Sequence, residues 1–70
     1  MSADLAALGR FSEPGLLILV SLSGGPKHGY AIMEDIAELR GVRLGPGTLY
    51  GTLKRLLESG LVEESEVLRG

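Results

Sequence analysis

The amino-acid sequence predicts one mainly α-helical domain, in which three helices are followed by a short β-strand. Three observations support this fold class. With 70 residues the chain has room for a single domain, so we treat residues 1–70 as one unit. Apolar residues recur at helical spacing in three segments, which glycine and proline separate. The chain contains no cysteine, which excludes disulfide and cysteine–zinc scaffolds.

The first core helix is expected over residues 13–23. Before it, residues 1–11 are rich in alanine and leucine and are expected to form a short helix or a loose arm. Pro14 suits the start of the first core helix, and the sequence Gly-Gly-Pro at 24–26 ends it. The run Leu16–Val20 is apolar on most sides, as in a buried central helix, although its β-branched residues leave a buried strand as the alternative.

The second helix is expected over residues 28–40. Its apolar face is marked at helical spacing by Tyr30, Met33, Ile36 or Ala37, and Arg40, with Ile32 and Leu39 on adjoining positions. The outer face carries the acidic residues Glu34, Asp35 and Glu38. Gly41 supplies a left-handed stop. This helix is therefore expected to bury one side and expose an acidic side.

The third helix is expected over residues 46–59, because Pro46 suits its first turn and Gly60 ends it. One arc is an apolar stripe of Leu49, Leu53, Leu56 and Leu57. The opposite arc carries small, hydroxyl and charged residues, namely Gly47, Thr48, Gly51, Lys54, Arg55 and Glu58. Residues 61–66 are then expected to form a strand that has no evident hairpin partner before Gly70.

This order of elements is the layout of a helix-turn-helix domain followed by the first strand of a wing. In such domains the third helix enters the major groove of DNA. Gly47 and Gly51 would let its backbone approach the DNA closely, and the free N–H groups of its first turn favour a phosphate. Thr48 can contact a phosphate or a base, and Lys54 and Arg55 can neutralise phosphates. Arg55 could instead read a guanine.

Several of these residues have alternative interpretations. Thr48 could serve only the backbone of the first turn, and Gly51 could mark a close helix–helix contact. Tyr50 lies at the margin of the apolar arc, so half-buried packing and a contact from its hydroxyl to a phosphate are equally expected. His28 stands at a helix start, where a structural hydrogen bond is expected rather than catalysis. One histidine offers neither a metal-binding set nor a catalytic triad.

The charge distribution favours a basic face on a domain whose net charge is −2. No acidic residue occurs between Leu39 and Leu57, whereas Arg40, Arg43, Lys54 and Arg55 fall there. The acidic residues lie on either side of this segment. Lys27 and Arg43 are further candidates for phosphate contacts. Chance placement of charges on a solvated surface is the alternative.

Two motifs resemble those of PadR-like transcriptional regulators. Gly25–Ile32, read as GPKHGYAI, resembles the family's G-P-x-H-G-Y-x-I signature, and Pro46–Tyr50 matches its P-G-T-L-Y. The resemblance runs from about Ser12 to Glu64. It implies a prokaryotic, cytoplasmic, repressor-type winged helix domain that binds operator DNA as a homodimer.

The resemblance also implies roles for individual residues. The motif matching Gly29 and Tyr30 would support the packing of the recognition helix. The structural motif residues would be His28, Gly29, Tyr30, Pro46 and Leu49. The residues at or beside the DNA would be Thr48, Tyr50, Lys54 and Arg55. The sequence departs from the family pattern at Gly45, where serine is usual, and it lacks the second wing strand and the C-terminal dimerisation helices. Effector binding and family-style dimerisation are therefore not carried over.

The resulting expectation is a sequence-specific DNA-binding regulator that needs no cofactor or metal ion and is not an enzyme. A winged helix module that binds proteins instead of DNA is the alternative, since fold alone does not define function. The stretch Leu5, Ala6, Ala7 and Leu8 is the candidate dimer contact, or it packs on its own domain. The longest uncharged, mostly apolar stretch, residues 14–23, is too short to span a bilayer.

Overall fold

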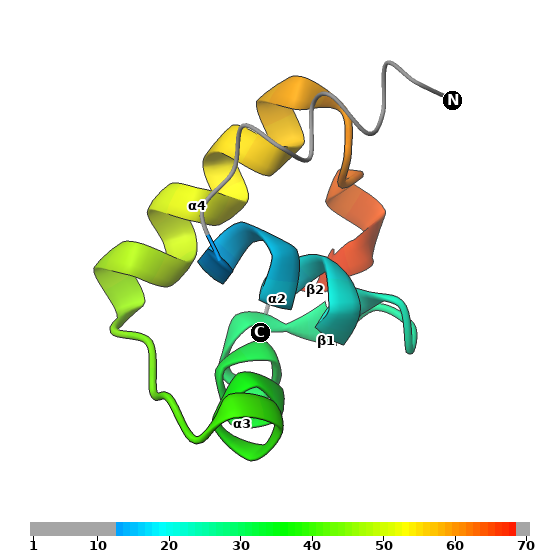
Figure 1. The fold of residues 1–70 in the computed structure, drawn as a ribbon. Coiled ribbons are helices and arrows are strands. Elements are labelled where there is room, and N and C mark those ends of the chain that lie inside the picture. The colour runs from blue at the N-terminus through cyan, green and yellow to red at the C-terminus, as the bar shows by residue number, and fades with distance from the viewer. Residues whose placement is uncertain (1–12, 69–70) are drawn as a thin grey trace.

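The structure is a computed structural model that describes residues 13–68, and it contains three α-helices around a common centre (Figure 1). The elements follow in the order α2 (Glu13–Leu22), β1 (Lys27–His28), α3 (Gly29–Arg40), α4 (Pro46–Ser59), the 3-10 helix η1 (Glu64–Glu66) and β2 (Val67–Leu68). Helix α2 packs against both α3 and α4. The N-terminal segment 1–11, with its candidate dimer contact, lies outside the described residues.

One hydrophobic core joins the three helices. Its fully or almost fully buried side chains are Ile18, Leu22, Ile32, Ile36, Leu49, Leu53, Leu56 and Val62. Burying a side chain of this size contributes roughly 1.5–3 kcal/mol relative to leaving it in water. The core therefore holds α4 rigidly against α2 and α3, and it leaves the opposite side of α4 in solvent.

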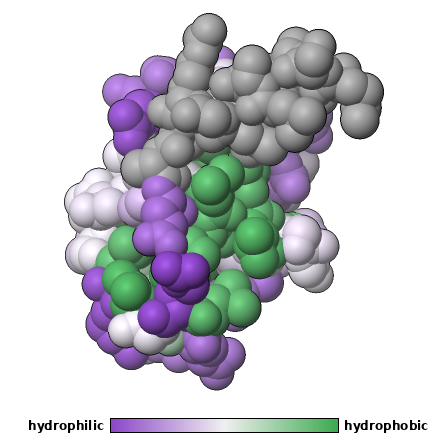
Figure 2. Space-filling model, in the orientation of Figure 1, coloured by the Kyte–Doolittle hydropathy of each residue, from purple (hydrophilic) through white to green (hydrophobic). Residues whose placement is uncertain are grey.

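Helix α2 is buried on one face only, which corrects the expectation that its apolar run is buried on most sides. Ile18 and Leu22 point into the core, whereas Leu16 and Val20 are 42% and 54% exposed. Figure 2 shows apolar atoms gathered in the middle of the face where α2 lies. The physical reason is size, because a domain of three helices has one layer around its core and each helix keeps a solvent face. The alternative of a buried strand is wrong.

Helix α3 buries a face that only partly matches the predicted one, since Ile32 and Ile36 are buried as expected and Tyr30 is not. Its buried residues are Gly29, Ile32 and Ile36, whereas Tyr30 is 67% exposed and Leu39 is exposed as well. Two stripes of residues, offset by one position, both satisfy helical spacing here. Packing against α2 and α4 selects the stripe that begins at Gly29. The helix starts one residue later than predicted, because His28 is extended and belongs to β1. Gly41 adopts φ 68° and ends the helix as expected.

Helix α4 has the predicted bounds, with proline in its first turn and Gly60 at φ 83° after its last residue. Its buried residues are Leu49, Thr52, Leu53 and Leu56, and Leu57 is half-buried. Thr52 was not predicted to be buried, although its position three residues after Leu49 and four before Leu56 places it within the same arc. The N-cap residue Gly45 provides no side-chain cap, as the departure from the usual serine predicts.

The predicted strand over residues 61–66 is wrong. Val62 is buried, and the acidic residues that follow form the 3-10 helix η1. This turn is held by a capping box, in which the Glu63 N–H donates to Glu66 Oε1 at 2.9 Å and the Glu63 side chain accepts from the Glu66 N–H. Such local side-chain bonds compete with extended structure. Strand β2 comes later and pairs in parallel with β1, Val67 opposite Lys27 and Leu68 opposite His28.

Candidate DNA-binding surface

The outer face of α4 presents the side chains that the sequence predicts there. Thr48, Lys54 and Arg55 are all exposed. Within residues 13–68, neither Lys54 nor Arg55 takes part in an ion pair. Both cationic groups therefore face solvent without an intramolecular counter-ion in the part of the chain that the structure describes.

Gly47 and Gly51 contribute no side chain to the first two turns of this face, where Thr48 is exposed. A Cβ atom added at either position would meet no atom within 4 Å. The alternative that Gly51 accommodates a close helix–helix contact is thus wrong for the described residues. A glycine inside a helix costs about 1 kcal/mol relative to alanine, and no contact in the described fold requires that cost. The bare surface is available to a partner outside the fold.

Tyr50 packs across the start of α3. A Cβ atom on Gly29 would lie only 2.9 Å from Tyr50 Cζ, so the aromatic ring occupies the space that glycine leaves free. Gly29 is buried, and Tyr50 remains 53% exposed. This contact favours the packing of Tyr50 on its own domain over the alternative in which its hydroxyl reaches a phosphate, since that hydroxyl is the atom nearest to a Cβ on Gly29. It also joins the two sequence motifs, because one supplies the glycine and the other the tyrosine.

A groove of about 670 Å³ runs between the start of α3, the exposed side of α4 and the C-terminal segment. It is lined by His28, Gly29, Tyr30, Tyr50, Leu53, Lys54, Leu57, Glu58, Glu64, Val67 and Leu68. The exposed ring of Tyr30 belongs to this surface, which sequence reasoning missed because it placed Tyr30 on the buried face. His28 makes no side-chain cap bond to α3. Within residues 13–68, the structural hydrogen bond predicted for it at this helix start is therefore not found.

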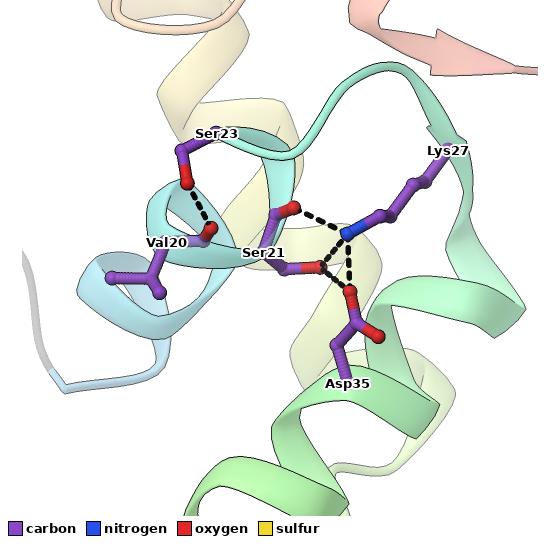
Figure 3. A network of polar contacts seen from close by, with 5 residues as sticks. All are labelled: Val20, Ser21, Ser23, Lys27 and Asp35. Carbon is purple, nitrogen blue, oxygen red and sulfur yellow. Dashed lines mark hydrogen bonds and ion pairs between the residues drawn. The ribbon is translucent and has the colours of Figure 1, made fainter.

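The ammonium group of Lys27 makes polar contacts with other residues of the domain (Figure 3). Its ammonium contacts Asp35 Oδ2 and donates to the backbone carbonyl of Ser21 at 2.5 Å, and the Ser21 hydroxyl donates to the same Asp35 oxygen at 2.7 Å. These bonds tie α2, β1 and α3 together. Asp35 was predicted on the solvated outer face, and Lys27 was a candidate for a phosphate contact. The network argues against both predictions.

Hydrogen bonds from Lys27 and then from Ser21 hold the pKa of the Asp35 carboxyl below its ordinary value of 3.8. The other candidate cation outside α4, Arg43, is exposed and lies 3.7 Å from Glu34, in a loose surface pair. Arg40 pairs with Glu13 at 2.6 Å, between α3 and α2. Of the predicted cations, Lys54 and Arg55 thus form no ion pair within residues 13–68, and Arg43 is exposed in the link that precedes α4.

The second and third helices of the core are joined by residues 41–45 only, and the third helix exposes one polar face next to a short β-ladder. This arrangement defines a winged helix-like domain of the helix-turn-helix class. The profile of the Transcriptional regulator PadR-like family matches residues 18–69. The chain belongs to this family of transcriptional regulators, as the two motifs indicated.

Two curated relatives are similar to this chain. An uncharacterized 37.1 kDa protein in transposon TN4556 of Streptomyces fradiae is 47% identical over 57 residues, which are 81% of this chain and 16% of the relative. The transcriptional activator GvpE2 of Halobacterium salinarum is 34% identical over 62 residues, which are 89% of this chain and 32% of the relative. The chain therefore spans a third or less of the length of these relatives. No solved structure was found to match it.

The hydrophobic segments of the described residues are short. None of the helices between residues 13 and 68 has the length and apolar character that crossing a membrane requires.

Proposed function

We propose that this domain binds double-stranded DNA in a sequence-specific manner and places α4 in the major groove. The observation that carries the proposal is the division of α4 into a buried leucine face and an exposed face. This exposed face bears Lys54 and Arg55, which form no ion pair within residues 13–68. A recognition helix needs both faces, one for docking on its own domain and one for the polyanion. Membership of a family of transcriptional regulators supports the same role.

Each residue of this face has a proposed task. Gly47 and Gly51 let the backbone of α4 approach the sugar-phosphate chain, and Thr48 bonds a phosphate or a base edge. Lys54 and Arg55 neutralise phosphates. Arg55 can instead bond the edge of a guanine base. Tyr50, at the margin of the face, positions α4 through its packing on Gly29 and stays 53% exposed beside the DNA backbone. Arg43, in the link before α4, adds a phosphate contact outside the groove.

We further propose repression as the regulatory outcome and a homodimer as the binding unit. Occupancy of a promoter is sufficient for repression, whereas activation also requires a contact with the transcription machinery. One similar protein is named an activator, so a reporter gene placed behind the bound promoter is the direct test. A dimer follows from the geometry of operators, in which two half-sites lie about one helical turn apart. The protein would act on DNA in the cytoplasm.

The test of DNA binding is a gel shift with the duplex that lies immediately upstream of the protein's own gene, repeated as a salt titration by fluorescence anisotropy. Two to four phosphate contacts per chain predict a slope of roughly −2 to −4 in log affinity against log salt. Mass measurement of the complex, with and without residues 1–9, tests the dimer. Absence of any duplex binding at low salt contradicts the proposal.

A protein-interaction domain is the second candidate, and the exposed apolar residues Leu16 and Val20 of α2 favour it. It predicts a stable complex with a partner protein that Leu16→Ser and Val20→Ser weaken, together with no affinity for duplex DNA. The salt titration described above distinguishes the two candidate functions, because only the DNA-binding domain should bind the duplex at low salt.

A further inference from the structure

The exposed face of α4 does not end in cations. Eleven residues separate Gly47 from Glu58, and at 100° per residue Glu58 returns to within about 20° of Gly47 around the helix axis. Lys54 lies on the same line, four residues before Glu58 and about 6 Å from it along the axis. The line Gly47, Gly51, Lys54 and Glu58 thus forms the centre of the surface proposed to face DNA, and its last member is an acid.

A second acid reaches this surface from a different element. Glu64, in η1, lines the same groove as Lys54, Tyr50 and Glu58. Both Glu58 and Glu64 are exposed, and no ion pair within residues 13–68 neutralises either of them. Two uncompensated carboxylates therefore border the cation of α4. Charges act on each other over about 10 Å at 0.1 M salt, so carboxylates that line the same groove as Lys54 weaken its attraction for phosphates.

We infer that Glu58 and Glu64 are specificity determinants, which weaken the binding of this domain to non-specific DNA. The inference rests on the proposed function. Non-specific binding consists almost entirely of attraction between cations and phosphates, so a carboxylate beside Lys54 subtracts from it directly. In a specific complex the Glu58 carboxylate can accept a hydrogen bond from a cytosine amino group, which offsets the repulsion.

The test compares Glu58→Gln, Glu64→Gln and the double variant with the unaltered chain on two duplexes, the upstream promoter fragment and a scrambled sequence of the same length. Each neutralised carboxylate should raise the affinity for the scrambled duplex roughly three- to eightfold at 0.1 M salt. The upper value is the affinity change expected for one full charge in the plot of log affinity against log salt. Affinity for the promoter fragment should rise less. The ratio of specific to non-specific affinity should therefore fall.

Glu38→Gln is the matched control, since Glu38 is exposed on α3 and does not line the groove beside α4. It removes the same charge and should leave both affinities nearly unchanged. Thermal unfolding of every variant verifies that the fold is retained. The inference is overturned if the Glu58 and Glu64 variants bind scrambled DNA no better than the Glu38 variant does. Failure of the unaltered chain to bind any duplex would instead contradict the proposed function, so the two failures are distinguishable.

Discussion

Two lysines of this domain have the same chemistry and opposite surroundings. Lys27 is held by Asp35 and by the backbone of Ser21, between α2, β1 and α3. Lys54 is exposed on α4, and no carboxylate within residues 13–68 pairs with it. The ammonium of Lys27 already has its counter-ion inside the fold, whereas that of Lys54 has none there. The availability of a cation for DNA thus depends on what the fold places beside it.

The largest effect is expected when the two free cations of α4 are removed. Lys54→Ala with Arg55→Ala should lower the affinity for any duplex roughly 60-fold at 0.1 M salt and make the salt slope shallower by about 1.8, since two phosphate contacts are lost. Because both side chains are exposed, stability should change by less than about 0.5 kcal/mol. Fluorescence anisotropy and thermal unfolding measure the two quantities.

Lys27→Met sharpens the comparison as the control. It removes one positive charge, as Lys54→Ala does, but it should leave the slope of log affinity against log salt unchanged. The free energy of unfolding should fall by about 1 kcal/mol, because bonds inside the fold are lost. A salt slope that responds to Lys27 as strongly as to Lys54 would contradict the distinction between the two lysines.

The next largest effect concerns the contact that orients α4. Gly29→Ala places a methyl group against the ring of Tyr50, so the ring must leave its position or α3 and α4 must separate. We expect a loss of about 1–2 kcal/mol in the free energy of unfolding, measured by urea denaturation. In a Tyr50→Ala background the same change should cost nothing, because alanine is otherwise the better helix former. Equal costs in both backgrounds would show that Tyr50 does not restrict position 29.

The smallest effect is a dependence of stability on pH. The folded pKa of Asp35 lies below its ordinary value of 3.8, so its stabilisation is fully present above that value. It is lost as pH falls through the folded pKa. Thermal midpoints measured from pH 7 to pH 2 should therefore decline in the acidic range for the unaltered chain. Asp35→Asn should decline less, and a parallel decline in the two proteins would rule out the contribution of this carboxyl.

Helix α4 was predictable because all the relevant signals are local. Pro46 and Gly60 delimit α4, and its leucines share one arc, so the exposure of Thr48, Lys54 and Arg55 follows from spacing alone. The segment after it was not predictable in the same way. An apolar pair followed by acids suggests a strand, but the capping box between Glu63 and Glu66 forms a 3-10 turn instead. The bonds of that turn compete with a strand that has no partner at this place.

The sequence by itself thus determined the helical class of this domain, the bounds of its third helix and its family, since helix boundaries, periodic apolar positions and short motifs are properties of neighbouring residues. Tertiary structure decided which face of α3 is buried, which lysine has a counter-ion inside the fold, and that Glu64 lines the same groove as Lys54. Those outcomes depend on contacts between segments far apart in the chain, such as Gly29 with Tyr50 and Lys27 with Asp35. Where the spacing of apolar residues fits two faces of a helix equally well, as in α3, packing against other segments decides which face is buried.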